Sequence, residues 1–275
     1  MNPLTNLYTF QQTTAHVAKP AGVLAIHGSA SNSKMWRPLQ AALHGAREVT
    51  TPDLDGYHSP PVQSDIEDRL EQLGAILQSQ PGPMDVVAHS FGGAIALKLA
   101  NVFPDRVSSV SIYDPVVPIR TGGGGSGLPA DLQARFHQVD TLDGAGLMQS
   151  FFEYWGGTDA WHALPMEKRQ RIQDYHPVFL RDLSELMSGK WTILRSRFKG
   201  PVTVFRGTKS KIATRQSCEQ IVDTFAQASW IDLPGLDHLA PITNPDPVIT
   251  ALMSGLAPYG STSDHHLTPH AKSAA

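Results

Sequence analysis

The chain has 275 residues, of which 41% are hydrophobic and 17% charged, a balance that supplies a large apolar core and excludes a largely disordered chain. Lysine and arginine total 22 against 25 aspartate and glutamate, a formal net charge of −3, so nucleic acid is not an expected partner, because phosphate binding needs a basic face. The single cysteine, Cys218, excludes an internal disulfide and predicts a reducing, cytoplasmic location, and no apolar run reaches the roughly 18 residues of a membrane span.

The first half of the chain alternates short apolar runs with longer helical patterns, which is typical of a mostly parallel sheet covered by helices. Glycine, proline or aspartate follows most of the apolar runs, as expected where a strand ends in a turn. Ser64 is the candidate N-cap of the second helix. The pattern predicts strands at 23–26, 47–51, 84–88 and 107–113, and helices at 34–43, 65–78 and 92–102.

This alternation breaks near residue 120. A glycine-rich segment, 121–127, is followed by helical patterns as far as residue 195. The sheet pattern then resumes with strands at 201–205 and 229–233 and helices at 215–225 and 247–256. We therefore expect an α/β core made of residues 1–119 and 196–257, a helical lid inserted at 120–195, and a disordered tail at 258–275.

Aromatic side chains are concentrated in the expected lid. The segment has nine of them, against twelve in the other 199 residues. They either form the lid's own core or line an apolar pocket that faces the sheet, and the sequence leaves both interpretations open. The nine are Phe136, Phe151, Phe152, Tyr154, Trp155, Trp161, Tyr175, Phe179 and Trp191.

The tail contains three histidines, His265, His266 and His270, which could suggest a metal site. Little in the tail is apolar, so a solvated segment is the expected reading and no metal is predicted. No motif elsewhere in the chain demands an organic cofactor.

A serine between an apolar strand and a helix carries the strongest chemical signal. Residues 86–94 read VVAHSFGGA, which places small residues on both sides of Ser90. A sharp strand-to-helix turn forces its central residue into a strained conformation and needs small neighbours such as Ala88 and Gly92. The turn lifts the hydroxyl out of the sheet, near a helix N-terminus that favours negative charge. We therefore predict that Ser90 is a nucleophile in a G-x-S-x-G turn, with Ala88 in place of the first glycine.

A serine hydroxyl is a poor nucleophile and needs a base beside it. His238 follows the last predicted strand, in the stretch PGLDHLAP at 234–241. A loop in that position opens at the same sheet edge as Ser90. His238 is therefore the predicted base.

The base in turn needs an acid that fixes its tautomer and stabilises the imidazolium. The loop after strand 201–205, where this acid is usual, has Ser210 in the place of an aspartate. Asp114 directly follows the strand 107–113, and we predict that it is the acid at the same edge. Asp237 adjoins His238 but normally points away from it, so it is the second candidate.

The oxyanion that develops in acyl transfer needs preorganised N–H donors. The backbone N–H of Phe91, directly after the nucleophile, is the first expected donor. The second is expected from the turn after the first strand, His27-Gly28-Ser29, and we assign it to the Ser29 N–H.

Four motifs in this order resemble the α/β-hydrolase superfamily: His27-Gly28, then PDLDGY at 52–57, AHSFGG at 88–93 and GLDH at 235–238. The resemblance runs from about residue 22 to 256. It implies an eight-stranded, mostly parallel sheet with helices on both faces and a lid inserted after the sixth strand. The segment before residue 22 is short for the family's first hairpin. The acid usual after the seventh strand is missing, but some members of the family carry it after the sixth, where Asp114 stands.

The resemblance implies a cofactor-free serine hydrolase that acts on a small molecule through an acyl-enzyme. The superfamily hosts several chemistries, and the fold does not choose among them. Ser90 argues against dehalogenases and epoxide hydrolases, whose family members have an aspartate nucleophile. The aromatic lid and the weak net charge favour a small or medium carboxylic ester with an apolar part.

Two alternatives stay open. The same site could cleave a C–C bond in a diketone-type ring-fission product, whose carboxylate needs a basic partner such as Lys34, Arg37, Arg120 or Arg135. The chain could instead be a ligand-binding protein on a hydrolase fold, which only the altered position of the acid supports. The sequence sets no oligomeric state.

Overall fold

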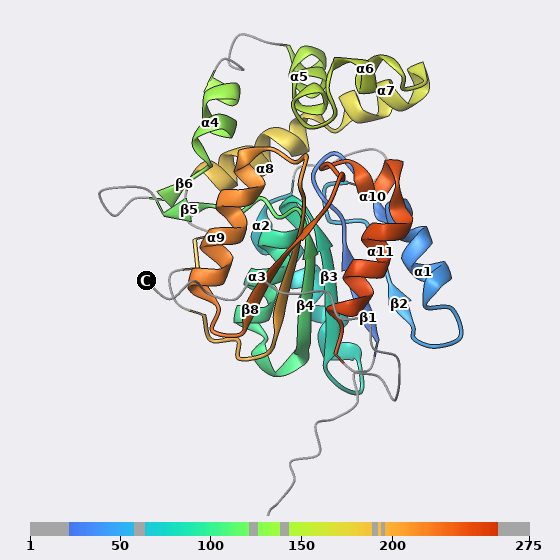
Figure 1. Ribbon diagram of the computed structural model, residues 1–275, viewed down its shortest axis with the longest axis vertical. Helices are drawn as coiled ribbons and strands as arrows, with labels where there is room; N and C mark the ends of the chain where they lie inside the picture. Colours follow the sequence, from blue (N-terminus) through green and yellow to red (C-terminus); the bar gives the residue numbers. More distant parts are fainter. Residues whose placement is uncertain are drawn as a thin grey trace, which may run out of the picture.

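The computed structural model describes residues 22–57, 64–120, 126–137, 143–188, 192–193 and 196–257. Its centre is a six-stranded parallel sheet with the strand order β2–β1–β3–β4–β7–β8 (Figure 1). The predicted α/β architecture is therefore confirmed. The strands are β1 (Val23–Ile26), β2 (Val49–Thr50), β3 (Met84–His89), β4 (Val107–Tyr113), β7 (Val202–Gly207) and β8 (Ala228–Leu233).

The implied count of eight strands is not met in the described part of the sheet. The family's first hairpin is expected before residue 22, and those residues lie outside the described ranges, as does the tail at 258–275 with its three histidines. A separate antiparallel pair, β5 (Ile119–Arg120) and β6 (Ser126–Gly127), follows β4 and leaves the main sheet.

Helices cover both faces of the sheet because its strands are apolar on both sides. Successive residues of a strand point to opposite faces. Val23 and Ala25 of β1 belong to one buried cluster and Leu24 and Ile26 to the other. The first cluster contains side chains of α1 (Arg37–Ala42) and α11 (Pro245–Ser254), and the second contains side chains of α2 (Ile66–Ser79), α3 (Phe91–Val102) and α9 (Ile212–Thr224).

The element boundaries differ from the predicted ones in two instructive places. The helix expected to have Ser64 as its N-cap has Asp65 instead, because Asp65 accepts from the Asp68 N–H while the Asp68 carboxylate accepts from the Asp65 N–H. This reciprocal pair satisfies two of the free N–H groups at the helix start. The second strand keeps two residues of the expected five, because β2 is an edge strand that pairs only with β1.

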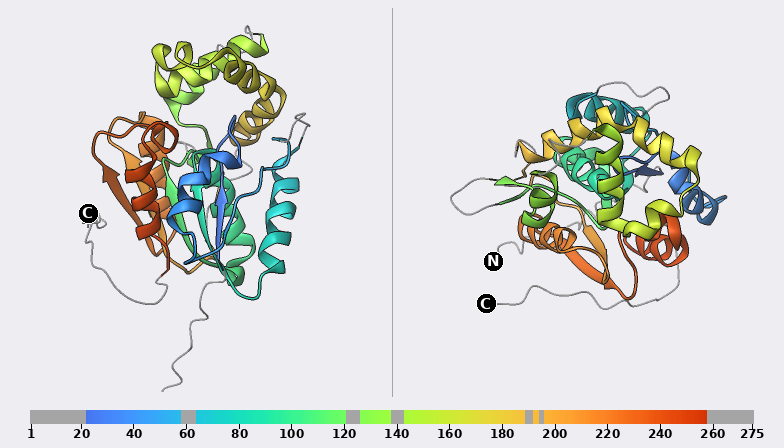
Figure 2. Two further views of the ribbon diagram at one scale, coloured as in Figure 1. Left: turned by 90° about the vertical axis from the view of Figure 1, so that its right-hand side faces the viewer. Right: turned by 90° about the horizontal axis from the view of Figure 1, so that it is seen from above.

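Five helices lie above the carboxyl ends of the strands (Figures 1 and 2). We call them the cap helices, and the segment that contains them falls between β6 and β7. They are α4 (Ala130–His137), α5 (Gly144–Gly156), α6 (Thr158–His162), α7 (Met166–Asp174) and α8 (His176–Met187). A shorter helix of the core, α10 (Ala240–Thr243), lies at the same edge (Figure 1). The 3-10 turn η1 (Ser33–Trp36) directly precedes α1.

The sheet order also locates a crevice. The chain passes from β1 outward to β2 and then returns to the other side of β1 with β3. In open α/β sheets, such a reversal leaves a crevice at the carboxyl ends of the two central strands, and ligands bind there. Ser29 follows β1 and Ser90 follows β3, so both stand at this point.

Candidate active site

Ser90 occupies a strained turn between β3 and α3. Its φ of 56° and ψ of −127° lie in a region that non-glycine residues rarely adopt. Its N–H donates to the carbonyl of Tyr113 at 3.2 Å, and its own carbonyl accepts from the N–H groups of Gly93 and Val116. The turn is thus held by β4, by α3 and by the segment after β4. Such strain persists only where the surroundings impose it, and it concentrates at functional sites.

The small residues around Ser90 are there because backbone from β1 passes very close. A Cβ added at Gly92 would lie 2.7 Å from the Ile26 carbonyl oxygen and closer still to that of His27. A Cβ added at Gly28 would lie 3.0 Å from Ser90 Cβ. The two glycines therefore let the turn after β1 lie directly against the turn after β3.

His238 reaches Ser90 although its strand, β8, is at the far edge of the sheet. The loop after β8 folds back over the ends of β7 and β4: the Lys209 N–H donates to the Leu236 carbonyl at 2.9 Å, and the Tyr113 hydroxyl donates to the Asp237 carbonyl at 2.6 Å. His89 Nε2 donates to the carbonyl of His238 itself at 3.0 Å. Three strand ends therefore fix the position of the imidazole.

Asp114 lies directly after β4 with a φ of 46° and is fully buried. Its carboxylate accepts from the Gly207 N–H at 3.0 Å and from the Ser210 hydroxyl. Ser210, which stands where an acid was expected after β7, is thus a hydrogen-bond donor to the acid after β4. Asp237, the second candidate, instead accepts from the Leu239 N–H at 3.0 Å, so its carboxylate serves the backbone of the loop.

The three side chains form one line of contacts. Ser90 Oγ lies 3.0 Å from His238 Nε2, and His238 Nδ1 lies 3.1 Å from Asp114 Oδ2. With the proton on Nδ1, the imidazole donates to Asp114 and leaves Nε2 free to accept from the serine hydroxyl. The structure therefore places a hydroxyl, a base and a carboxylate in the order that nucleophilic catalysis needs.

Burial sets the protonation states of this line. All three side chains are at most 6% exposed. Removal from water lowers the pKa of His238, while the charge of Asp237 acts in the opposite direction. Burial has the opposite effect on a carboxyl group: it raises the pKa of Asp114, while the hydrogen bonds from Ser210 and Gly207 act to lower it. A neutral imidazole is the form that can accept a proton, so the site is poised as a base.

The two expected oxyanion donors lie on the pocket beside Ser90. Ser29 and Phe91 both line it. Within the described part of the chain, neither backbone N–H donates to another protein group. The turn that carries Ser29 is held by His27, whose Nδ1 donates to the Gly28 carbonyl at 2.8 Å while its Nε2 accepts from the Leu54 N–H at 3.0 Å. The PDLDGY motif at 52–57 thus helps to hold the His27-Gly28 turn in place.

The pocket itself is apolar and is closed on one side by the cap. Its core wall includes Ser90 and Val116, and its cap wall comes from α4, α5 and α8. Four of the nine lid aromatics line it, while Phe152 and Trp161 pack against each other at 5.7 Å within the cap. Both readings of the aromatic excess therefore hold, each for different residues; Trp191 lies outside the described residues. The pocket aromatics are Phe136, Phe151, Trp155 and Phe179.

A buried charge cluster beside the pocket was not anticipated. Asp182 of α8 accepts from the Ser29 hydroxyl at 2.6 Å, from the Tyr57 hydroxyl at 2.5 Å and from Arg69 Nη1 at 2.5 Å. Arg69 and Asp182 are each 1% exposed. The available signal was an arginine in the apolar stripe of its helix, between Ile66 and Leu73. Nothing in the sequence pointed to its partner on a cap helix.

The four basic residues considered as carboxylate partners are not among the side chains that line this pocket. Lys34, Arg37 and Arg120 are exposed, and the guanidinium of Arg135 lies near the Ser150 carbonyl. Arg69 is linked to the oxyanion turn through Asp182, which accepts from the Ser29 hydroxyl, and Asp182 neutralises its charge.

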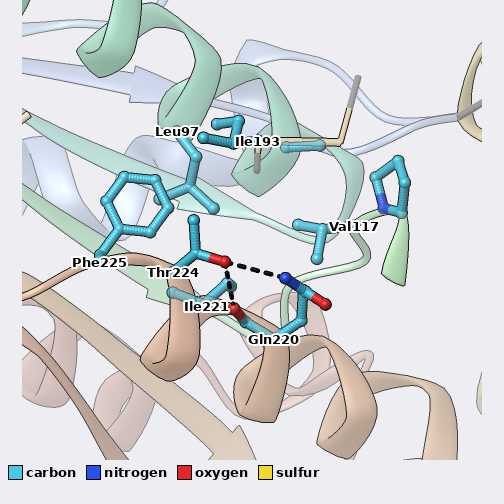
Figure 3. Close-up of a pocket in the computed structure, with 9 residues that line it drawn as sticks. Leu97, Val117, Ile193, Gln220, Ile221, Thr224 and Phe225 are labelled. Atoms are coloured by element: carbon cyan, nitrogen blue, oxygen red, sulfur yellow. Dashed lines mark hydrogen bonds between the residues drawn. The ribbon is translucent and has the colours of Figure 1, made fainter. Parts of the chain in front are cut away.

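A second hollow lies on the flank of the core, between α3, α9 and the segment after β4 (Figure 3). Leu97, Val117 and Phe225 line it, and Gln220 Nε2 donates to Thr224 Oγ1 in its wall at 2.9 Å. None of its lining residues is Ser90, His238 or Asp114.

Among the described residues no group of three His, Cys, Asp or Glu could hold a metal ion, and no described helix has the length and apolar character to cross a membrane.

Comparison with known proteins identifies the family. A family model described as the alpha/beta hydrolase family matches residues 23–251. The chain is an α/β hydrolase. The predicted superfamily is therefore confirmed.

Relatives of this α/β hydrolase include proteins named for ester cleavage. It is 36% identical over 129 residues to lipase LipV of Mycobacterium tuberculosis, a match that covers 46% of this chain and 48% of that lipase. The matched stretch thus spans about half of that relative.

Solved structures match the fold over most of the chain. A thermophilic esterase from Thermogutta terrifontis has a TM-score of 0.64 at 22% identity, covering 86% of this chain and 89% of that one. The 2-hydroxy-6-oxo-6-phenylhexa-2,4-dienoate hydrolase from Rhodococcus sp. strain RHA1 has a TM-score of 0.60 at 19% identity, covering 86% and 90%. At these identities the likeness shows the fold alone.

Proposed function

We propose that this α/β hydrolase is a cofactor-free serine hydrolase that cleaves carboxylic esters of small or medium, partly apolar molecules. The observation that carries the proposal is the line of contacts from Ser90 Oγ through His238 to Asp114, at 3.0 and 3.1 Å. The apolar pocket beside Ser90 supports an uncharged substrate. The relative named as a lipase is consistent with it.

In the first half of the reaction, Ser90 Oγ attacks the carbonyl carbon of the ester while its proton passes to His238 Nε2. The negative charge that forms on the carbonyl oxygen is held by the Ser29 and Phe91 N–H groups. Asp114 stabilises the imidazolium and keeps its ring in place. The intermediate then collapses: the bond to the alkoxy oxygen breaks, His238 returns its proton to that oxygen, and the alcohol leaves an acyl group on Ser90.

In the second half, a water molecule takes the place of the alcohol. His238 Nε2 accepts a proton from this water as its oxygen attacks the acyl carbon, and the same two N–H groups hold the oxyanion. The bond to Ser90 Oγ then breaks, the serine recovers its proton from His238, and the carboxylic acid is released.

The substrate class follows from the walls of the pocket. Its free volume is about 20 Å³, which is room for about one water molecule. An acyl chain of several carbons therefore enters only when side chains of the cap helices move. We propose that residues 120–195 act as a lid in this sense, over the core of residues 1–119 and 196–257.

The apolar lining and the neutralised Arg69 favour an uncharged acyl group over a carboxylate. The C–C bond hydrolase alternative needs a basic partner for its substrate, and the pocket lining supplies none that is unpaired among the described residues. The partner of this protein is then a small molecule. The cytoplasm suits its single, buried cysteine, Cys218.

The test is a comparison of wild type with Ser90→Ala on p-nitrophenyl acetate, butyrate and octanoate, together with labelling by a fluorophosphonate probe. Ser254→Ala is the matched control, because Ser254 is exposed at the end of α11, where its hydroxyl donates only to a helix carbonyl. We expect wild type and Ser254→Ala to turn over esters and to be labelled, and Ser90→Ala to do neither while keeping its circular dichroism spectrum.

Retained ester turnover in folded Ser90→Ala would overturn the assignment of the nucleophile. Wild type that binds apolar ligands but neither labels nor turns over any ester would favour the ligand-binding alternative, because labelling needs an activated hydroxyl.

A further inference from the structure

One cap residue lies flat on the proposed base. The indole of Trp155, near the end of α5, stacks on the imidazole of His238 with 3.7 Å between ring centroids and 21° between ring planes. Trp155 is 5% exposed and also lines the pocket beside Ser90. No other described aromatic ring lies closer to His238; the ring of His89 is 4.7 Å away.

Resting on the proposed function, we propose that Trp155 is a positioning residue for the base: its indole covers one face of the His238 ring, holds its plane toward Ser90 and keeps water away from it. The cap then completes the catalytic machinery as well as enclosing the substrate.

The residues that follow Trp155 and His238 in the sequence allow α5 to approach the base closely. Gly156 follows Trp155, and Leu239 follows His238; a Cβ added at Gly156 would collide with the Leu239 side chain. The glycine therefore lets the end of α5 descend onto the loop that carries the base. The ring of Tyr154 meets the indole edge to face at 4.6 Å and braces it, and the Tyr154 hydroxyl is anchored by Asp131 of α4 at 2.5 Å.

The charge state of His238 depends on what faces it. Asp114 meets Nδ1, the buried ring of His89 lies at 4.7 Å, and Asp237 adjoins it in the loop. From the cap, Trp155 is the uncharged neighbour. Lys211, in the core segment between β7 and α9, has its ammonium 5.6 Å from the centre of the Tyr154 ring. Burial is the main cause that lowers the pKa of His238, with Asp237 opposing it. An indole stacked on the ring supplies part of that burial.

The same indole acts differently once the proton has moved. A cation over an aromatic face is attracted by the negative face of the ring. The stacked ring therefore favours the imidazolium of the transition state over the same apolar cover without a π face. The two effects act in opposite directions on the His238 pKa, because cover from water lowers it and stacking on the cation raises it. Burial is the main cause of the shift, so we expect the loss of cover to decide the pH profile and the loss of stacking to lower the rate.

The experiment compares Trp155→Phe, Trp155→Leu and Trp161→Leu. Phenylalanine keeps a stacked ring, and it removes an indole N–H that has no partner among the described residues, so no hydrogen bond is lost. Leucine removes the ring. Trp161 is the matched control, because it is a buried cap tryptophan whose described ring contact is with Phe152, at 5.7 Å and 57°, and not with His238.

The readouts are kcat/KM for p-nitrophenyl butyrate from pH 3 to 8.5, at every pH where the protein remains folded, and the pKa of His238 from its ¹⁵N chemical shifts. We expect Trp155→Phe to stay within about 3-fold of wild type with the same acid limb. We expect Trp155→Leu to lose about 10-fold or more and to raise the acid limb and the His238 pKa by about one unit as water reaches the ring. Trp161→Leu should lower the stability of the protein and leave the acid limb of kcat/KM and the pKa of His238 unchanged.

An unmoved acid limb in folded Trp155→Leu, or an equal movement in Trp161→Leu, would overturn the proposal. Should Trp155→Leu not fold, Trp155→Met fills more of the same volume and carries the same prediction. The two proposals fail separately: wild type that is never labelled at Ser90 contradicts the serine hydrolase, whereas labelled wild type with an unshifted Trp155→Leu profile contradicts only the role of Trp155. The ¹⁵N titration reads the role of Trp155 even in a protein without ester turnover.

Discussion

The Ser210 hydroxyl donates to Oδ2 of Asp114, the same carboxylate oxygen that lies 3.1 Å from His238 Nδ1. Ser210 stands after β7, where the resemblance to the family leads one to expect the acid, and Asp114 stands after β4. The two positions therefore face the same point of the imidazole from neighbouring strands. A carboxylate at either of these two sequence positions would therefore occupy nearly the same place beside the imidazole.

This relationship predicts a swap. Asp114→Asn should lower kcat/KM for p-nitrophenyl butyrate by about 10⁴-fold, because an amide at this place no longer stabilises the imidazolium or the correct tautomer. Asp114→Asn/Ser210→Asp should recover part of that loss, since its new carboxylate starts from a residue already in contact with the same place. Asp237→Asn is the control, because its carboxylate caps the Leu239 N–H. A loss in Asp237→Asn as large as that in Asp114→Asn would reassign the acid.

The close approach of β1 to the serine turn predicts a steric effect on stability. Gly92→Ala should lower the free energy of unfolding by about 2–4 kcal/mol, because the new Cβ would meet two backbone oxygens that cannot rotate away. The thermal midpoint should fall by about 5–15 °C. Gly127→Ala is the matched control: nothing lies within 4 Å of its Cβ position, and we expect no measurable change. A Gly92→Ala protein as stable as wild type would contradict the packing of this turn.

The charge cluster at Asp182 predicts a non-additive double substitution. Asp182→Asn leaves the buried guanidinium of Arg69 without a counter-charge and should cost about 3–5 kcal/mol in urea unfolding. Arg69→Met/Asp182→Leu removes both charges and should be far more stable than Asp182→Asn. Arg215→Met breaks an exposed pair with Glu219 and should change stability by less than about 0.5 kcal/mol. Equal losses in the single and double variants would show that the pair is not the source of the effect.

Burial of His238 predicts the acid side of the pH profile. A base works in its neutral form, and burial lowers the pKa of this imidazole below its ordinary value of 6.5. As the pH falls, the neutral form therefore persists below 6.5, and kcat/KM should begin to fall only at a more acidic pH. An acid limb at or above pH 6.5 would show a hydrated imidazole and contradict the buried geometry.

Thermal midpoints at each pH are the control for that measurement. Burial lowers the pKa of His89 to about 3, so the unfolded chain binds protons at these histidines below about pH 6.5 that the folded chain does not. Their contribution to stability therefore decreases as the pH falls from 6.5 toward 3. Only pH values at which the protein remains folded enter the rate profile.

Much of the core could be predicted from the sequence because parallel buried strands are continuous apolar runs with turn residues at their ends. β4 has the predicted bounds, and β3 differs by one residue. Since carboxyl ends of parallel strands meet at one edge, residues directly after those strands could be assigned to one site, and the structure places Ser90, Asp114 and His238 there. Ser64 was the wrong cap because local pattern does not distinguish it from Asp65, which has a reciprocal partner at Asp68.

The contacts from the cap could not be predicted in the same way. Periodicity shows that a helix has an apolar side, but it does not show which core residue that side meets across a hundred positions of chain. Asp182 reaches Ser29 over 153 residues, and Trp155 reaches His238 across most of the cap and β7. Both contacts depend on how α5 and α8 are set over the sheet, which follows from packing of the whole layer.

These two contacts limit how the enzyme could be remodelled. A cap that only covered the pocket with apolar side chains could be exchanged between related hydrolases. Here Asp182 of α8 accepts a hydrogen bond from Ser29, and Trp155 of α5 stacks on His238. A cap grafted from another hydrolase would therefore remove both contacts at once. New substrate ranges are then more accessible through single replacements at pocket-facing positions such as Phe136 or Phe179 than through domain grafting.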